Sequence, residues 1–175
     1  MPSVRFWRRV FFQEGMLIMK RIFAAVFILA LMAVTAEGFD RKELIERAFS
    51  AIHNSYAPYS HFNVASAVLC SSGKIYTGVN VENASYSAGI CSERTAIVHA
   101  VAEGEREIVA IAIIGGPGGK ITDYCPPCGI CRQFMREFCD PEKFIVILAK
   151  SPDEWIEMTL AQLLPMSFGP DNLKH

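Results

Sequence analysis

The sequence carries Cys-Ser-Glu at residues 91–93 and Pro-Cys-Gly-Ile-Cys-Arg at residues 127–132. These segments offer three thiols, and thiolates are preferred ligands of zinc. Three protein ligands leave one position of a tetrahedral zinc ion open, and a water there loses a proton near neutral pH. The segments therefore predict a catalytic zinc centre, with one Zn²⁺ held by Cys91, Cys128 and Cys131. Glu93 follows the first ligand by two residues and is the predicted catalytic acid and base.

The same cysteines allow other interpretations. A Cys-x-x-Cys pair is typical of thioredoxin-like redox couples, and with Cys125 the pair resembles the start of an iron–sulfur ligand run. The next ligand of such a run is missing, because position 135 is Met135. Cys125 added to the three predicted ligands would give a closed structural zinc site. Glu93 disfavours a closed site, although a glutamate in a first helical turn often only offsets the helix dipole.

The first 36 residues differ from the rest of the chain. They hold five basic side chains and one acidic one, followed by an uncharged apolar run at 22–36. From Met19 onward, a basic start, an apolar stretch and small residues ending at Ala36 are typical of a secretory signal. The run is shorter than the roughly 20 apolar residues of a membrane span. We expect a signal-like or extension segment at 1–36 and one catalytic domain at 37–175.

The charge of the predicted domain bears on its partners. Residues 37–175 hold 12 basic and 17 acidic side chains, a net charge of about −5, and the basic residues do not cluster. Proteins that hold a polynucleotide normally present basic side chains along the strand. The sequence therefore predicts a small-molecule substrate and no nucleic-acid partner, and we expect no stable membrane association of the domain.

Apolar patterns after residue 37 alternate between helix and strand. Asp40 begins a helix with apolar residues at helical spacing, and Glu43 fits a capping box. Two apolar runs, at 62–70 and 75–79, are joined by Ser-Ser-Gly-Lys at 71–74 and predict a β-hairpin. The other expected elements are a helix at about 91–103, a buried strand at 108–114, a helix at about 128–139, a strand at 144–148 and a short helix from Thr159 to Pro165. This order predicts an α/β fold, a mixed sheet with helices on its faces.

The expected elements bring the two cysteine segments to helix N-termini. Cys91 stands where one helix begins, and Cys128 and Cys131 lie one turn apart at the start of another. The positive ends of both helix dipoles favour thiolate over thiol. We expect Arg94 and Arg132 to donate hydrogen bonds to the sulfurs, since groups behind the ligands tune a metal site. The alternative for either arginine is a surface salt bridge.

Five segments resemble, in order, the small homotetrameric cytidine deaminases. They are 57–64 (Ala-Pro-Tyr-Ser-His-Phe-Asn-Val), 78–86 (Gly-Val-Asn-Val-Glu-Asn-Ala-Ser-Tyr), 91–96 (Cys-Ser-Glu-Arg-Thr-Ala), 127–133 (Pro-Cys-Gly-Ile-Cys-Arg-Gln) and 163–170 (Leu-Leu-Pro-Met-Ser-Phe-Gly-Pro). The resemblance spans roughly residues 40–170. It implies a three-layer α/β/α fold, a homotetramer with shared active sites, and zinc-dependent hydrolysis of cytidine and 2′-deoxycytidine to the uridine nucleosides and ammonia, in pyrimidine salvage.

The resemblance also implies substrate contacts, taken position by position. Phe62 matches an aromatic residue that packs on the pyrimidine ring, which suits base stacking. Asn80 and Glu82 match residues that hydrogen-bond the ribose hydroxyls, and the backbone of Ser92 matches a contact to the base carbonyl. The implied contacts across a subunit interface come from Tyr86 and Phe168. Ordinary packing of Phe62 and Phe168 and a turn role for Asn80 are the alternatives.

The sequence departs from the family pattern at a few positions. Ala65-Ser66 stands where Gly-Ala is common, and Ser92 stands where alanine is frequent. Three cysteines, Cys70, Cys125 and Cys139, are surplus to the predicted zinc site. They would have to be buried or paired in an exported protein.

Two questions stay open at the level of sequence. The resemblance implies a cytosolic enzyme, whereas the signal-like segment implies export. A zinc deaminase for another aminopyrimidine compound and a non-enzymatic zinc module are the alternative functions. The first alternative would share the metal ligands, so Phe62, Asn80, Glu82 and Phe168 are the residues that discriminate.

Overall fold

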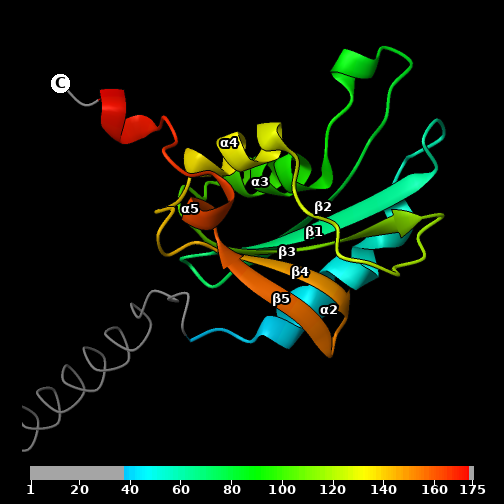
Figure 1. Ribbon diagram of the computed structural model, residues 1–175, viewed down its shortest axis with the longest axis horizontal. Helices are drawn as coiled ribbons and strands as arrows, with labels where there is room; N and C mark the ends of the chain where they lie inside the picture. Colours follow the sequence, from blue (N-terminus) through cyan, green and yellow to red (C-terminus); the bar gives the residue numbers. More distant parts are fainter. Residues whose placement is uncertain (1–37, 174–175) are drawn as a thin grey trace, which may run out of the picture. The chain divides into compact units, whose positions relative to one another are not determined.

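A computed structural model describes residues 38–173, and these form a five-stranded sheet with helices on both faces (Figure 1). The strand order is β2-β1-β3-β4-β5. β3 and β4 run parallel and the other neighbours run antiparallel. The strands are β1 (Phe62–Cys70), β2 (Ile75–Val79), β3 (Ile108–Pro117), β4 (Ile145–Ser151) and β5 (Glu154–Thr159). The predicted mixed sheet and its opening hairpin are confirmed.

Four α-helices and three short 3₁₀ turns accompany the sheet in the described range. They are α2 (Arg41–Ala51), η1 (Ile52–Asn54), η2 (Tyr86–Ala88), α3 (Ser92–Ala102), α4 (Gly129–Arg136), α5 (Leu160–Leu163) and η3 (Pro170–Leu173). Thr159 caps α5 in a complete capping box with Gln162. No helix of the described residues is long and apolar enough to cross a membrane. The predicted segment at 1–36 lies outside the described residues.

The two faces of the sheet bury separate cores, because side chains alternate along a strand. On β1, Ala65, Ala67 and Leu69 pack with α2, while Val68 and Cys70 pack with α3 and α4. Most interior residues of β3 and β4 divide in the same way. Every buried strand therefore needs apolar residues on both sides, which explains the nearly continuous apolar runs in its sequence. The expected three-layer α/β/α arrangement is confirmed.

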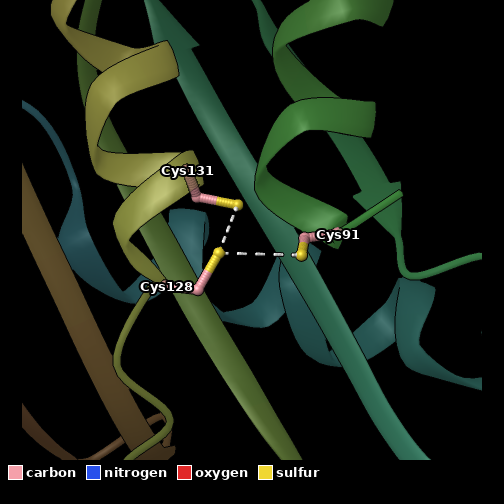
Figure 2. A group of neighbouring side chains, drawn as sticks. All are labelled: Cys91, Cys128 and Cys131. Atoms are coloured by element: carbon pink, nitrogen blue, oxygen red, sulfur yellow. Dashed lines mark hydrogen bonds between the residues drawn. The ribbon is translucent and has the colours of Figure 1, made fainter. Parts of the chain in front are cut away.

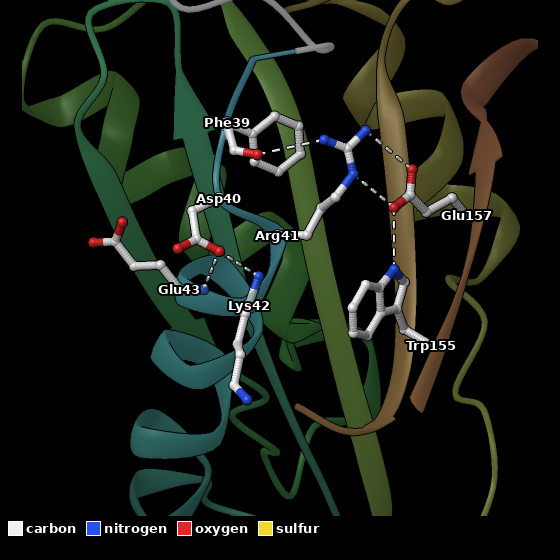
Figure 3. Close-up of polar contacts among 7 residues, drawn as sticks. All are labelled: Phe39, Asp40, Arg41, Lys42, Glu43, Trp155 and Glu157. Atoms are coloured by element: carbon white, nitrogen blue, oxygen red, sulfur yellow. Dashed lines mark hydrogen bonds and ion pairs between the residues drawn. The ribbon is translucent and has the colours of Figure 1, made fainter. Parts of the chain in front are cut away.

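The N-terminal end of α2 is joined to the edge strand β5 (Figure 3). Asp40 caps the helix by accepting from the backbone N–H groups of Lys42 and Glu43. Arg41 donates to both carboxylate oxygens of Glu157, at 2.8 and 3.3 Å, and Trp155 Nε1 donates to the same carboxylate at 3.1 Å. A bidentate arginine–carboxylate pair adds geometric specificity to the packing of Leu44, Ile45 and Ala48, which holds α2 on the sheet.

Element boundaries differ from the sequence expectations at the C-terminal half. α4 ends at Arg136 and not near Cys139, whose thiol donates to the Met135 carbonyl. β3 continues through the glycines to Pro117, since its partner β1 pairs with it that far. The sequence did not predict β5. Its side chains are mostly exposed or half-buried, so no strict alternation marks it, and it forms by pairing with β4.

A candidate metal centre

Three thiols meet where α3 and α4 begin (Figure 2). Cys91 is the residue before the first turn of α3, Cys128 is the residue before α4, and Cys131 lies in the first turn of α4. The sulfurs of Cys91 and Cys128 are 4.0 Å apart and those of Cys128 and Cys131 are 3.5 Å apart. The structure thus brings together the three predicted ligands, although 37 residues separate the first from the second.

The spacing of these sulfurs suits a tetrahedral zinc ion. Zinc–sulfur bonds of ~2.3 Å at tetrahedral angles place two sulfurs about 3.8 Å apart, and the two measured separations lie on either side of this distance. Among the described residues, the group that could hold a metal contains these three cysteines and excludes Cys125. Cys125 lies instead against Gly115, where an added Cβ would stand 2.8 Å from its sulfur. The arrangement therefore favours an open site over a closed four-thiolate one.

When no metal is present, the thiols of Cys91 and Cys131 have very different pKa values. The Cys131 thiol, Arg94 and Cys128 stabilise the Cys91 thiolate and outweigh its partial burial, which lowers the pKa of Cys91 to about 5. Interaction with the Cys91 thiolate raises the pKa of Cys131, and burial adds to this effect. Outside this site, burial raises the pKa of the Cys139 thiol to about 12, so this cysteine serves as a comparison. Cys91 is therefore ionised before Cys131.

This difference predicts selective alkylation of the metal-free protein. At pH 7 Cys91 is a thiolate, so iodoacetamide should modify it about 10-fold or more faster than Cys139. The rate at Cys91 should stay level from pH 8 to 6 and fall as the pH drops through about 5, where the thiolate becomes protonated. Peptide mass spectrometry after timed quenching measures both rates, and zinc added first should protect Cys91. Equal rates at the two cysteines would contradict the assignment.

Glu93 lies in the first turn of α3, and its side chain is buried, with 4% of the residue exposed. Its Oε2 accepts a hydrogen bond from the Ser92 hydroxyl at 3.1 Å. Burial raises the pKa of Glu93, and the negative charge of Cys91 adds to this shift. A carboxyl group held in this way carries a proton more easily than an exposed one, which suits a group that must accept and return protons.

The two predicted arginines have different partners. Arg94 donates through Nη2 toward the Cys91 sulfur at 3.9 Å and toward the Gly89 carbonyl at 3.5 Å. Arg132 donates to two backbone carbonyls instead, those of Pro127 and Leu163, each at 2.8 Å. Arg94 thus contacts a predicted ligand directly. Arg132 thus joins the residue before Cys128 to α5, so its contacts position the loop that carries this cysteine.

A cavity of about 400 Å³ is lined by two of the predicted substrate residues, Glu82 and Tyr86. The Glu82 carboxylate accepts from the backbone N–H groups of Tyr59 and Ser60, at 2.9 and 3.2 Å, and from the Ser60 hydroxyl. These bonds, the Ser60 hydroxyl first, lower the pKa of Glu82, so it is an anion near neutral pH. Tyr86 is 81% exposed and makes an edge contact with Tyr59. Sequence reasoning missed the two residues that hold Glu82, since hydrogen bonds between distant loops leave no spacing signal.

The Asn80 side chain forms hydrogen bonds to the backbone at the beginning of β1. Its Oδ1 accepts from the Val64 backbone at 2.8 Å and from the Ser55 hydroxyl, while its Nδ2 donates to the Phe62 carbonyl at 2.9 Å. These contacts hold the beginning of β1 in place, and they leave the second hydrogen of Nδ2 for another acceptor. Phe62, which Asn80 holds, is the first residue of β1 and is 39% exposed.

Phe168 lies in the segment between α5 and η3, and 60% of it is exposed. Its backbone carbonyl accepts from Gln133 Nε2, on α4, at 3.0 Å. The contact anchors the backbone of this segment to the helix that carries Cys131. The aromatic ring stays largely free in a single chain, and Phe168 is not among the residues that line the cavity around Glu82.

Comparison with known proteins bears on this site. The sequence profile of the cytidine and deoxycytidylate deaminase zinc-binding region matches residues 39–148. A cytidine deaminase of Halalkalibacterium halodurans is 40% identical over 134 residues, which cover 77% of this chain and 98% of that protein. A cytidine deaminase of Sporosarcina psychrophila is 38% identical, with 78% and 96% covered.

Solved structures give the same result. The crystal structure of cytidine deaminase from Burkholderia pseudomallei aligns with a TM-score of 0.67 at 39% identity, covering 74% of this chain and all of that one. The enzyme from Mycobacterium tuberculosis aligns with a TM-score of 0.64 at 31% identity, covering 75% and 98%. With its three-thiol cluster, its buried glutamate and this agreement along most of its length, the chain belongs to the zinc-dependent cytidine and deoxycytidylate deaminase family.

Proposed function

We propose that this protein hydrolyses cytidine and 2′-deoxycytidine to uridine and 2′-deoxyuridine, releasing ammonia. The observation that carries the proposal is the cluster of Cys91, Cys128 and Cys131 at two helix N-termini with the buried Glu93 one residue inside α3. The relatives named cytidine deaminase support the substrate class. The negative charge of residues 37–175 supports a free nucleoside over a nucleic-acid strand.

The chemistry proposed for the site is general acid and base catalysis by one carboxylate. Zinc, when bound by the three cysteines, supplies a water acidic enough to lose a proton near neutral pH. Glu93 accepts that proton on its carboxylate and passes it to N3 of the ring, so that the oxygen can attack C4. Glu93 then takes the proton of the new C4 hydroxyl group and gives it to the amine, which leaves as ammonia while the C4 carbonyl forms. Its burial supports this double role, because burial raises the pKa of the carboxyl group and makes the protonated form easier to reach.

We propose that the substrate is bound by groups that can still donate or accept a hydrogen bond. The Ser92 N–H is at the first position of α3, where a helix provides no acceptor, so it can donate to the base carbonyl. The Glu82 carboxylate and the second Nδ2 hydrogen of Asn80 can bind ribose hydroxyls. Phe62 offers a half-exposed ring for stacking on the pyrimidine.

We also propose a homotetramer in which Phe168 and Tyr86 reach a neighbouring subunit's site. Large exposed apolar side chains support this proposal, since Tyr86, Phe168, Ile130 and Met166 are all more than half exposed in the single chain. Light scattering coupled to gel filtration measures the mass. A monomer that turns over cytidine at the full rate would contradict the shared site.

The domain boundaries and the compartment remain proposals of the same kind. We propose that residues 37–175 are the catalytic domain of a pyrimidine salvage enzyme and that residues 1–36 are an extension. We place the enzyme in the cytosol, with export through the segment from Met19 to Ala36 as the alternative. N-terminal sequencing of the natural protein decides between them, because a mature chain that begins after Ala36 requires processing.

The decisive experiment for the function is a direct assay. Purified protein added to cytidine should cause the loss of cytidine absorbance, with equimolar ammonia formed. A strong chelator should abolish the activity and added zinc should restore it. Activity on another aminopyrimidine but not on cytidine would replace the substrate assignment. A zinc-loaded protein inactive on all of these compounds would overturn the enzymatic proposal.

A further inference from the structure

Three buried polar side chains form a hydrogen-bonded row beside Cys91 of the candidate metal centre. In the described part of the chain, the residues that are both buried and polar or charged are Ser66, Ser92 and Glu93. The hydroxyl oxygens of Ser66 and Ser92 lie 2.6 Å apart, and the Ser92 hydroxyl donates to Glu93 Oε2 at 3.1 Å. Both serines have no measurable exposure. The row therefore joins the carboxylate to the interior of the sheet without contact with solvent.

The members of this row come from different elements that pack closely. Ser66 is on β1, opposite Gly78 of β2, while Ser92 is the first residue of α3. A Cβ on Gly78 would stand 2.6 Å from the Ser92 carbonyl oxygen and 2.2 Å from the Ala96 nitrogen. Only a glycine allows this close approach of α3 to the sheet. The approach brings the two hydroxyls within hydrogen-bonding distance.

The hydrogens of the row can be assigned by counting. A serine hydroxyl has one hydrogen and can accept further bonds on its oxygen. The ionised Glu93 carboxylate can only accept, so in that state Ser92 uses its hydrogen on Glu93 Oε2 and the hydrogen between the serines belongs to Ser66. Ser66 thus donates to Ser92, which donates to Glu93. Each of these two hydroxyl hydrogens therefore has an acceptor. The chain of hydrogen bonds ends on the Glu93 carboxylate.

We propose that Ser66 and Ser92 are positioning residues that hold Glu93 Oε2 and so leave Oε1 to exchange protons. The inference rests on the proposed catalytic role of Glu93. The carboxylate also interacts with its own backbone N–H and with the Cys131 thiol. Without the Ser92 contact it is held by fewer groups, so its second oxygen spends less time in the productive orientation. Positions 66 and 92 are also two of the three, with Ala65, at which small residues depart from the pattern of the resembling family, and the side chains of these two contact each other.

Three variants test the proposal: Ser92→Ala, Ser66→Ala and the double variant. Ser92→Ala should lower kcat on cytidine about 10-fold with KM within about 2-fold, because one hydrogen bond to a charged group is lost. The Ser66 hydroxyl is then buried without its partner, so the melting temperature should fall by about 3 to 6 °C.

The double variant removes both hydroxyls and should recover the melting temperature while kcat stays about 10-fold low. Ser66→Ala alone should lower kcat only about 2- to 3-fold, since Ser92 still donates to Glu93.

The separation of kcat from thermal stability is what distinguishes positioning from a structural role. Ser72→Ala is the matched control, because the Ser72 hydroxyl donates to the Glu105 carboxylate at 2.9 Å away from the site. This control should keep wild-type kcat. A crystal structure of metal-free Ser92→Ala should show the Glu93 carboxylate turned from its wild-type orientation, a result that needs no activity.

Two results would overturn the proposal. One is wild-type kcat in Ser92→Ala, and the other is a double variant that recovers kcat together with melting temperature. An unchanged Glu93 orientation in the Ser92→Ala crystal would count equally against it. If the wild-type protein fails to deaminate cytidine, the proposed function fails, while the crystal and melting experiments still decide whether the serines hold the carboxylate.

Discussion

Replacement of Glu93 by glutamine is expected to lower kcat on cytidine by roughly 10²- to 10⁴-fold, the usual contribution of a general acid and base. Glutamine has nearly the same size and can still accept from the Ser92 hydroxyl, so the fold should be kept. It cannot take up a proton from water or return one to the leaving amine. Zinc content and nucleoside affinity should therefore remain close to wild type. Stopped assays for turnover, metal analysis and equilibrium binding of uridine measure the three quantities.

The matched control for this variant is Glu43→Gln. Glu43 also lies in the first turn of a helix, but that helix is α2 on the opposite face of the sheet and the side chain is exposed. Its loss removes one favourable helix-dipole contact and should leave kcat unchanged. Turnover in Glu93→Gln within a few-fold of wild type would refute the catalytic assignment.

The second large effect is expected from Cys128→Ala. The variant should lose its zinc, because two thiols alone hold the ion weakly, and its activity should fall to background. The metal joins the beginnings of α3 and α4, so the melting temperature should also drop, by about 8 °C or more if zinc was near saturation. Metal analysis of the dialysed protein and thermal unfolding measure both effects.

Cys125→Ala is the informative control for the zinc ligands. Its thiol lies three residues before Cys128 but outside the three-sulfur group, so zinc should be retained at one ion per chain. Loss of zinc from this variant would support the closed four-thiolate site. Wild-type zinc content and melting temperature in Cys128→Ala would instead remove Cys128 from the ligand set.

The agreement between sequence and structure is closest where the pattern is local. The hairpin of β1 and β2 was predicted to the residue, and the beginning of α3 beside Cys91 was predicted within one. Those features follow from apolar runs, a Gly-containing turn and helix-start signals, all readable within a few residues. β5 was missed because its pairing with β4 forms it, and its own side chains show no regular burial.

The sequence by itself determined the thiolate chemistry of the metal centre, the order of the main elements and the resemblance to the family. Thiol identity and spacing are properties of the chain, and they limit the chemistry before any folding. Only the tertiary structure decided that Cys125 stays outside the sulfur group, that Arg132 holds backbone carbonyls and that Ser66 meets Ser92. These outcomes depend on distances of a few ångströms between residues far apart in the chain. Packing of α3 and α4 against the sheet sets such distances, and no short sequence pattern encodes them.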